Sequence, residues 1–221
     1  MSASQTDLVA VLQQARERLA GQGLAEPYVA GLAASLSLRL PGEPAMLLLL
    51  ATETAPQRVP FPVSASGASG AAALHASIYA ERDDVGAIVV GGGPFGEALA
   101  DVGGALPQVF DEQARHLGTM RGPVGKLSSA ALADALAAGA NSVLVEGVPV
   151  CMGTTCQRMV FNAELFEKCA KAYVLAASTG QKVTTLPWLV TRIANGRMRK
   201  DERRAAERFA RGLLPEESRG Y

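Results

Sequence analysis

The stretch LHASIYAERDDVGAIVVGGGPFGEALA, which runs from Leu74 to Ala100, decides the fold class of this chain. Ala71 to Arg82 (AAALHASIYAER) predicts a helix, and Gly86 to Val90 (GAIVV) predicts a short buried strand. A glycine-rich turn, GGGPFG, then leads into a second helix, GEALADVG. A helix, a strand and a helix in immediate succession favour an α/β architecture.

Elements of both kinds continue on either side of this stretch. Helical spacing and caps predict helices at Leu8–Gly21, Leu127–Gly139, Gln157–Ser178 and from Pro187 into an arginine-rich tail. Alternating or apolar runs predict strands at Ser35–Leu40, Ala45–Thr52, Ala105–Phe110 and Asn141–Gly147, with VPVCMG (148–153) as a hairpin partner. Thr54–Gly70 is rich in Pro, Ser and Gly and predicts a loop. The mixture predicts one domain over residues 1–221, with residues 188–221 as a helical tail.

Composition narrows the class of protein. The chain of 221 residues carries 21 Lys plus Arg and 21 Asp plus Glu, so its zero net charge gives no general attraction to nucleic acid or to an anionic membrane. The longest apolar run, Ala45 to Ala51, is far too short to span a bilayer. The first residues lack a basic segment followed by an apolar one, and we read the three cysteines as reduced thiols. We therefore expect a cytoplasmic protein.

The turn after the predicted strand has the spacing of a dinucleotide fingerprint. Gly91, Gly93 and Gly96 form Gly-x-Gly-x-x-Gly between a strand and a helix, and Asp111 follows 20 residues after Gly91. The stretch before Asp111 contains Pro107 and no run of β-branched residues, so a second parallel strand is poorly supported. A tight turn without a ligand is the favoured interpretation, and nucleotide binding at Gly91–Gly96 remains an alternative.

A different pattern explains more of the chain. LHASIYAERDDVGAIVV followed by GGGPFGEALA resembles the central signature of the class II aldolase/adducin family, and NSVLVEGVPVCMG resembles its strand, apolar hairpin and glycine. QRMVFNAELFEKCAKAYVLA resembles the helix that follows, and GLAASLSLRLPG resembles the N-terminal strand. Together these segments cover about Val29 to Pro187 in consistent order. The resemblance implies a three-layer α/β fold with a central, mostly antiparallel sheet flanked by helices.

The resemblance also shows what this chain lacks. The family's zinc lyases use a glutamate and three histidines, and these positions fall at Ala71, Val90, Gly92 and Gly147, none of which can bind a metal. Zinc in such enzymes acts as a Lewis acid on the substrate's carbonyl. The resemblance therefore implies a member with no metal and no other cofactor.

Candidate catalytic residues remain few. Glu146 lies beside the position of the third lost ligand, and His75, Cys151 and Asp111 are the other side chains that could form a new catalytic set. His75 lies on the predicted helix and is favoured as a structural histidine with satisfied hydrogen bonds rather than a general base. The catalytic residues stay unknown at this stage.

Two further side chains invite a chemical interpretation. Cys156 lies near the start of a predicted helix, which can lower a thiol pKa, although inert buried cysteines are commoner. His116 follows Asp111 and Glu112 at helical reach, which predicts a surface ion pair between the histidine and a carboxylate.

Three functions follow from these observations. The first is a metal-independent pseudoenzyme, small-molecule binder or assembly subunit, and the second is a repurposed metal-free enzyme with lyase-type chemistry in the old pocket. The third is nucleotide binding at Gly91–Gly96. The resemblance implies a homo-oligomer, typically a tetramer, and we expect no nucleic-acid or membrane partner.

Overall fold

The computed structural model describes residues 5–25, 32–62 and 70–217. In this part of the chain, six strands form one sheet in the order β3-β2-β1-β4-β6-β5, and every neighbouring pair is antiparallel. The strands are β1 (Ser35–Arg39), β2 (Ala45–Leu50), β3 (Gln57–Pro60), β4 (Ala87–Val90), β5 (Ser142–Val145) and β6 (Val148–Gly153). The predicted antiparallel sheet is confirmed.

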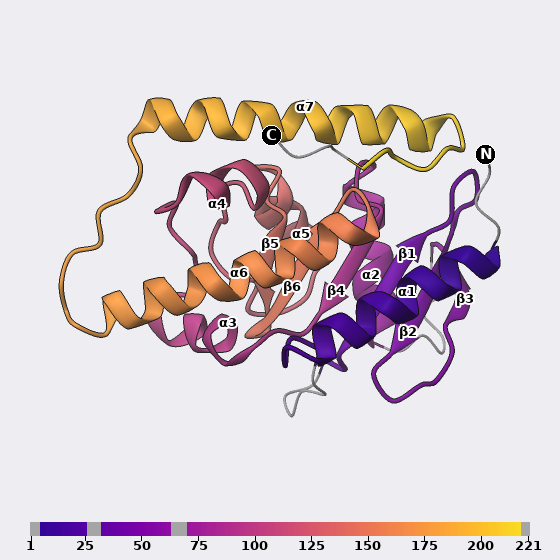
Figure 1. Cartoon of the computed structure of the whole chain (residues 1–221), viewed down its shortest axis with the longest axis horizontal. Helices are drawn as coiled ribbons and strands as arrows, with labels where there is room; N and C mark the ends of the chain where they lie inside the picture. Colours follow the sequence, from indigo (N-terminus) through magenta and orange to yellow (C-terminus); the bar gives the residue numbers. More distant parts are fainter. Residues whose placement is uncertain (1–4, 26–31, 63–69, 218–221) are drawn as a thin grey trace.

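Helices cover both faces of the sheet and make three layers (Figure 1). Helices α1 (Gln5–Ala20) and α6 (Cys156–Ala177) lie on one face, and α2 (Gly70–Glu81) and α5 (Ser129–Leu136) lie on the other. The short helices α3 (Pro94–Ala98), η1 (Leu99–Val102) and α4 (Asp111–His116) follow β4. The last helix, α7 (Trp188–Ala210), packs against α4 along one edge of the molecule.

Alternation along the strands produces two hydrophobic cores. In β1, Leu36 and Leu38 belong to the core under α1 and α6, whereas Ser35 and Ser37 face α2. In β4, Val89 belongs to the first core and Val90 to the second, which contains residues of α2 and α5. Successive side chains of a strand point to opposite faces, so this pattern fixes which residues can meet.

Side-chain caps set the start of two helices. The hydroxyl of Ser128 accepts a hydrogen bond from the backbone N–H of Ala131 at the start of α5, and Thr155 accepts one from Arg158 at the start of α6. Such caps satisfy backbone donors that have no partner within the helix. Both helices begin within two residues of the predicted starts, Leu127 and Gln157.

Two predictions about local structure are wrong. Ala105–Phe110 is not a strand. Its backbone is hydrogen-bonded instead to the Gln113 side chain, which donates to the Pro107 carbonyl and accepts from the N–H of Val109. Within the predicted loop Thr54–Gly70, Gln57–Pro60 forms edge strand β3, whose mainly exposed side chains give no apolar signal.

Residues 63–69 of that loop, and Val29 to Gly31 at the start of the family resemblance, lie outside the described residues. No helix in the described ranges is long and apolar enough to cross a membrane.

Candidate functional site

The positions that correspond to the family's zinc ligands lie near the C-terminal end of β4. Val90 ends β4 and pairs with Val150 of β6, and both are fully buried. Glu146 and Gly147 form a two-residue turn between Val145 and Val148, with φ of 52° and 83°. Positive φ at both central residues is the geometry of a type I′ hairpin, which glycine adopts without steric cost.

Pro149 fills the space beside Gly92. A Cβ atom added to Gly92 would lie 2.6 Å from Cγ of Pro149, and the N–H of Gly91 donates to the Pro149 carbonyl over 2.9 Å. A side chain at position 92 would therefore have to displace the proline ring. We call Val90, Gly92, Gly147 and Pro149 the β4 corner.

The β4 corner does not fit a zinc ion. Valine and glycine side chains provide no lone pair, whereas zinc in proteins is held by thiolate, imidazole or carboxylate ligands. Ala71, at the position of the family's glutamate, is buried and equally without a donor. In the described ranges, no group of three or more His, Cys, Asp or Glu side chains could hold a metal ion.

The glycine turn after β4 is occupied by the protein itself. The carboxylate of Glu167, from α6, accepts hydrogen bonds from Phe95 N–H (2.9 Å) and Gly96 N–H (2.7 Å). A Cβ at Gly93 would lie 2.6 Å from the Glu167 carboxyl group, so the glycine makes room for this side chain.

Both neighbours of β4 are antiparallel, so no βαβ unit is present around this turn either. The fingerprint of Gly91, Gly93 and Gly96 thus serves an internal contact, and the nucleotide alternative loses its support.

His75 is buried and has hydrogen bonds at both ring nitrogens. Its Nε2 lies 3.0 Å from Ser35 Oγ and its Nδ1 lies 2.7 Å from Ser37 Oγ. Ser37 Oγ also contacts the hydroxyl of Tyr79 at 2.8 Å. Burial lowers the pKa of His75 to about 3, so the ring stays neutral and is not available as a base near neutral pH. This is the satisfied structural histidine that the sequence favoured.

The four candidate residues are not brought together. His75 lies between the sheet and α2, and Cys151 belongs to the core on the opposite face. Glu146 is exposed at the hairpin turn and accepts a hydrogen bond from Leu127 N–H, and Asp111 is exposed at the start of α4. These positions supply no convergent nucleophile, base and orienting group.

The cysteines are not activated. Burial raises the pKa of Cys151 above its usual range, and it raises the pKa of Cys156 and of Cys169 to about 12. Cys156 does begin α6, as expected, but desolvation outweighs any effect of the helix terminus.

The predicted ion pair of His116 is wrong. Its Nδ1 lies 3.0 Å from Nη1 of Arg158, and its ring meets Phe161 edge to face. Because an arginine only donates, Nδ1 of His116 acts as the acceptor. Burial and the nearby Arg158 lower the pKa of His116 to about 4.

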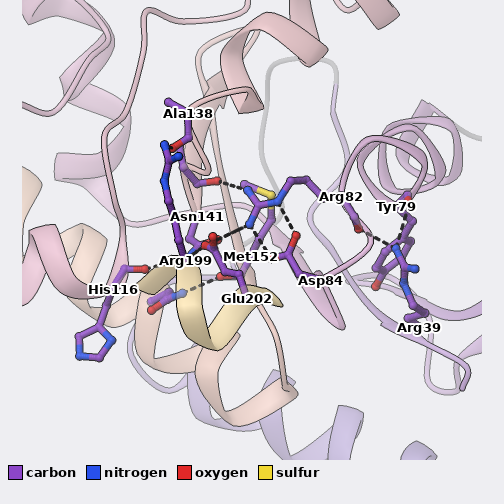
Figure 2. A network of polar contacts seen from close by, with 12 residues as sticks. Arg39, Tyr79, Arg82, Asp84, His116, Ala138, Asn141, Met152, Arg199 and Glu202 are labelled. Carbon is purple, nitrogen blue, oxygen red and sulfur yellow. Dashed lines mark hydrogen bonds and ion pairs between the residues drawn. The ribbon is translucent and has the colours of Figure 1, made fainter. Parts of the chain in front are cut away.

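A buried set of charged groups, which sequence analysis missed, lies beyond the N-terminal end of β4 (Figure 2). Arg82 donates from Nε and Nη2 to the two carboxylate oxygens of Asp84, both at 2.7 Å. Its Nη2 also meets Asn141 Oδ1 (3.0 Å) and Glu202 Oε1 (3.2 Å), and its Nη1 donates to the Ala140 carbonyl. We call Arg82, Asp84, Asn141 and Glu202 the Arg82 network.

The Arg82 network joins α7 to the rest of the fold. Glu202 is 8% exposed and also accepts from Asn141 Nδ2, and burial raises its pKa to about 7. All three guanidinium nitrogens of Arg82 have partners within the protein. Because these partners come from within the fold, we interpret the arrangement as a structural tie rather than an active site.

Comparison with known proteins supports the fold. The family described as class II aldolase and adducin N-terminal domain matches residues 43–174, more than half of the chain. No curated protein matches the chain.

Several solved structures share its fold at low identity. They include YgbL from Escherichia coli, a putative aldolase/epimerase/decarboxylase (20% identity, TM-score 0.66, 85% of this chain and 97% of that chain). An L-fuculose 1-phosphate aldolase has 17% identity and a TM-score of 0.67 over 90% of this chain and 98% of its own. An aldolase II superfamily protein from Pseudomonas syringae has 16% identity and a TM-score of 0.63 over 96% of each chain. At such identities the likeness establishes the fold alone.

Proposed function

Because the chain belongs to the class II aldolase and adducin N-terminal domain family, we propose that it is a metal-independent member that binds a small molecule and does not perform the family's zinc-dependent lyase reaction. The observation that carries the proposal is the β4 corner. The side chains at Val90, Gly92 and Gly147 have no donor atoms, and the Pro149 ring takes the space that a ligand side chain at Gly92 would need. A Lewis-acid mechanism needs a metal held by protein ligands, and these residues provide none.

A repurposed enzyme is the less favoured alternative. It would need a new set of reactive groups close together, and the candidates Glu146, His75, Cys151 and Asp111 lie on different faces and at different ends of the sheet. The buried charged groups of the Arg82 network are close together, but their hydrogen bonds are used within the fold.

We propose further that the protein assembles as a homo-oligomer, a tetramer by the family resemblance. Large apolar side chains near the start of α7 are open to solvent: Trp188 is 70% exposed, Leu189 57% and Ile193 53%. Apolar side chains gathered on a surface often mark an interaction site.

The test measures metal content and molecular mass on one preparation, purified without chelators and without a histidine tag. We expect far less than one metal ion per chain by mass spectrometry, in a folded oligomer by light scattering, and no cleavage of L-fuculose 1-phosphate. Zinc, iron or manganese at one ion per chain would overturn the proposal.

A designed variant tests whether the β4 corner lacks only the ligand side chains or also the space for them. V90H/G92H/G147H restores three imidazoles, and we expect it to bind zinc weakly or to lose stability, because Pro149 stands where the side chain of residue 92 must begin. Adding Pro149→Gly removes the ring and is expected to improve zinc affinity over the triple variant. Tight zinc binding by the triple variant with Pro149 intact would show that the corner is not closed.

A further inference from the structure

The exposed large apolar side chains of the described residues gather where α7 begins. Eight such side chains are exposed in the described ranges, and five of them lie in the first two turns of α7 or directly before α4: Phe110, Trp188, Leu189, Val190 and Ile193. The N–H of Leu186 donates to the carbonyl of Gln108 over 2.9 Å, and α7 packs beside α4, so the two segments form one surface (Figure 1). We call these five residues the α7 patch.

A notch of about 140 Å³ lies within this surface, between α4 and α7. Its lining combines apolar and charged side chains: Val190, Ile193, Ala194, Asp111, Arg115 and Arg197. An apolar cavity of about 150 Å³ can hold a benzene molecule, so the notch has room for one aromatic ring.

The cations of the notch also suit an aromatic occupant. Arg115 is already paired with Asp201. Arg197 is exposed and lies within ion-pair distance of no carboxylate in the described ranges. A guanidinium without a carboxylate partner attracts the face of an aromatic ring.

Charges of both signs lie unpaired around the α7 patch. Asp111 and Arg192 are exposed, and neither lies within ion-pair distance of an opposite charge among the residues that the structure describes. The guanidinium of Arg192 lies over the ring of Trp188, 5.5 Å from its centroid. A partner that receives the Trp188 ring therefore meets Arg192 as well.

These features complement one another when two copies of the surface meet. In a two-fold contact both copies present the same patch, and each contact occurs twice. Trp188 of one copy can then enter the notch of the other, and Arg192 comes with it to Asp111 at the edge of that notch. An anionic membrane or a nucleic acid would attract Arg192 and Arg197 but repel Asp111, whereas a second copy satisfies charges of both signs.

We propose that the α7 patch is a two-fold contact between two copies of this chain, in which Trp188 of each copy fills the notch of the other and Arg192 of each copy pairs with Asp111 of the other. The proposal rests on the homo-oligomer proposed above and names the surface of one of its contacts. A two-fold contact closes a dimer, so a tetramer needs a second contact on another surface. The β4 corner takes no part, and the metal measurement is independent of this contact.

The first test follows the accessibility of Trp188 in the full chain. Because Trp188 is the only tryptophan, its fluorescence reports on the α7 patch alone. We expect acrylamide to quench the oligomer weakly although the indole is 70% exposed in the single chain, because the other copy covers it. Strong quenching in an oligomer of confirmed mass would show that Trp188 lies outside the contact and refute the proposal.

A charge exchange tests the pairing of Asp111 with Arg192. D111R and R192D each place like charges opposite one another, and each should weaken the association of copies at least about tenfold, measured by light scattering over a dilution series. The double variant D111R/R192D exchanges the two charges and should restore association. D111R also places a cation at the start of α4, which destabilises a helix, but damage of that kind would not be repaired by R192D on α7.

W188A removes the ring that fills the notch, and V11A provides its control at an apolar residue of α1 that is 41% exposed and lies outside the patch. We expect W188A to reduce the mass of the assembly and V11A to leave it unchanged. An oligomer whose mass survives both W188A and D111R would refute the α7 patch and leave the homo-oligomer proposal standing.

A wild-type chain that stays monomeric would overturn both the contact and the homo-oligomer. If such a monomer sediments with phosphatidylserine vesicles and W188A abolishes the sedimentation, the patch binds a membrane surface instead of a second copy.

Discussion

The two ends of strand β4 carry different kinds of side chain, although the strand is only four residues long. At the C-terminal end, the β4 corner consists of valine, glycine and proline, with Gly92 in close contact with Pro149. Beyond the N-terminal end lie Arg39 and the Arg82 network, with several buried or half-buried charges. In this chain the polar groups lie at the end where the family resemblance places no metal ligand.

The two ends of β4 are stabilised in different ways. The stability of the β4 corner depends on shape, because Gly92 packs closely against Pro149 and the side chains there are apolar. The stability of the Arg82 network depends on all of its members, because a buried charge that loses its partners destabilises the fold. The two ends should therefore respond differently to substitution and to pH.

The largest effect is expected from removing Arg82. R82M keeps most of the side-chain volume but leaves the carboxylates of Asp84 and Glu202 without their cation, and both side chains are nearly buried, at 12% and 11% exposed. Breaking a buried ion pair by removing one partner costs about 3–5 kcal/mol. We expect a loss of this size in the free energy of unfolding, measured by urea denaturation.

A surface ion pair provides the matched control for R82M. Arg121 and Asp134 are 45% and 75% exposed, so R121M should cost less than about 1 kcal/mol. Similar losses for R82M and R121M would mean that the Arg82 network is not the tie that we describe.

The next effect tests whether the β4 corner is closed. G92A places a Cβ 2.6 Å from Cγ of Pro149, and overpacking of this kind costs about 1–3 kcal/mol. Adding P149A removes the outer ring atoms, so the double variant should lose less stability than the sum of the two single variants. The measurement is a double-mutant cycle by thermal or urea unfolding.

Gly122 supplies the control for G92A, since a Cβ there would meet no atom within 4 Å. G122A should be close to neutral. If G92A is as neutral as G122A, the β4 corner has room for a side chain beside Pro149 and is not closed.

Sequence reasoning succeeded where the cause is local. The alternation of SLSLR fixed the faces of β1, the Glu146-Gly147 pair lies at the predicted hairpin, and the position of His75 on an apolar helix favoured a satisfied histidine. Each of these follows from side-chain periodicity or turn chemistry within a few residues.

The missed features depend on partners far away in the chain. Glu167 fills the turn at Gly96 from 71 residues away, and Glu202 reaches Arg82 across 120 residues. In the sequence, Glu202 is one charge among many on a charged helix, and nothing local distinguishes it from its exposed neighbours. Edge strand β3 was missed for the opposite reason, because its exposed side chains leave no hydrophobic pattern.

The smallest effect, and the most specific, concerns the pH response of Glu202. Its pKa is about 7 in the folded protein, against 4.5 for an ordinary glutamate, chiefly because burial disfavours the carboxylate. Between these values the folded protein binds a proton that the unfolded chain does not, so this group's contribution to stability falls as pH rises from about 4.5 to 7 and is constant above.

E202Q removes that proton uptake while retaining a side chain of the same shape. The stability difference between wild type and E202Q should therefore shift by ~1–2 kcal/mol in favour of the variant between pH 5 and pH 8, measured by urea unfolding at both values. His75 and His116 have lowered pKa values and act in the opposite direction, but they are present in both proteins, so their contribution cancels in the difference. A difference that is independent of pH would show that Glu202 is ionised throughout, held by Arg82 more strongly than burial opposes it.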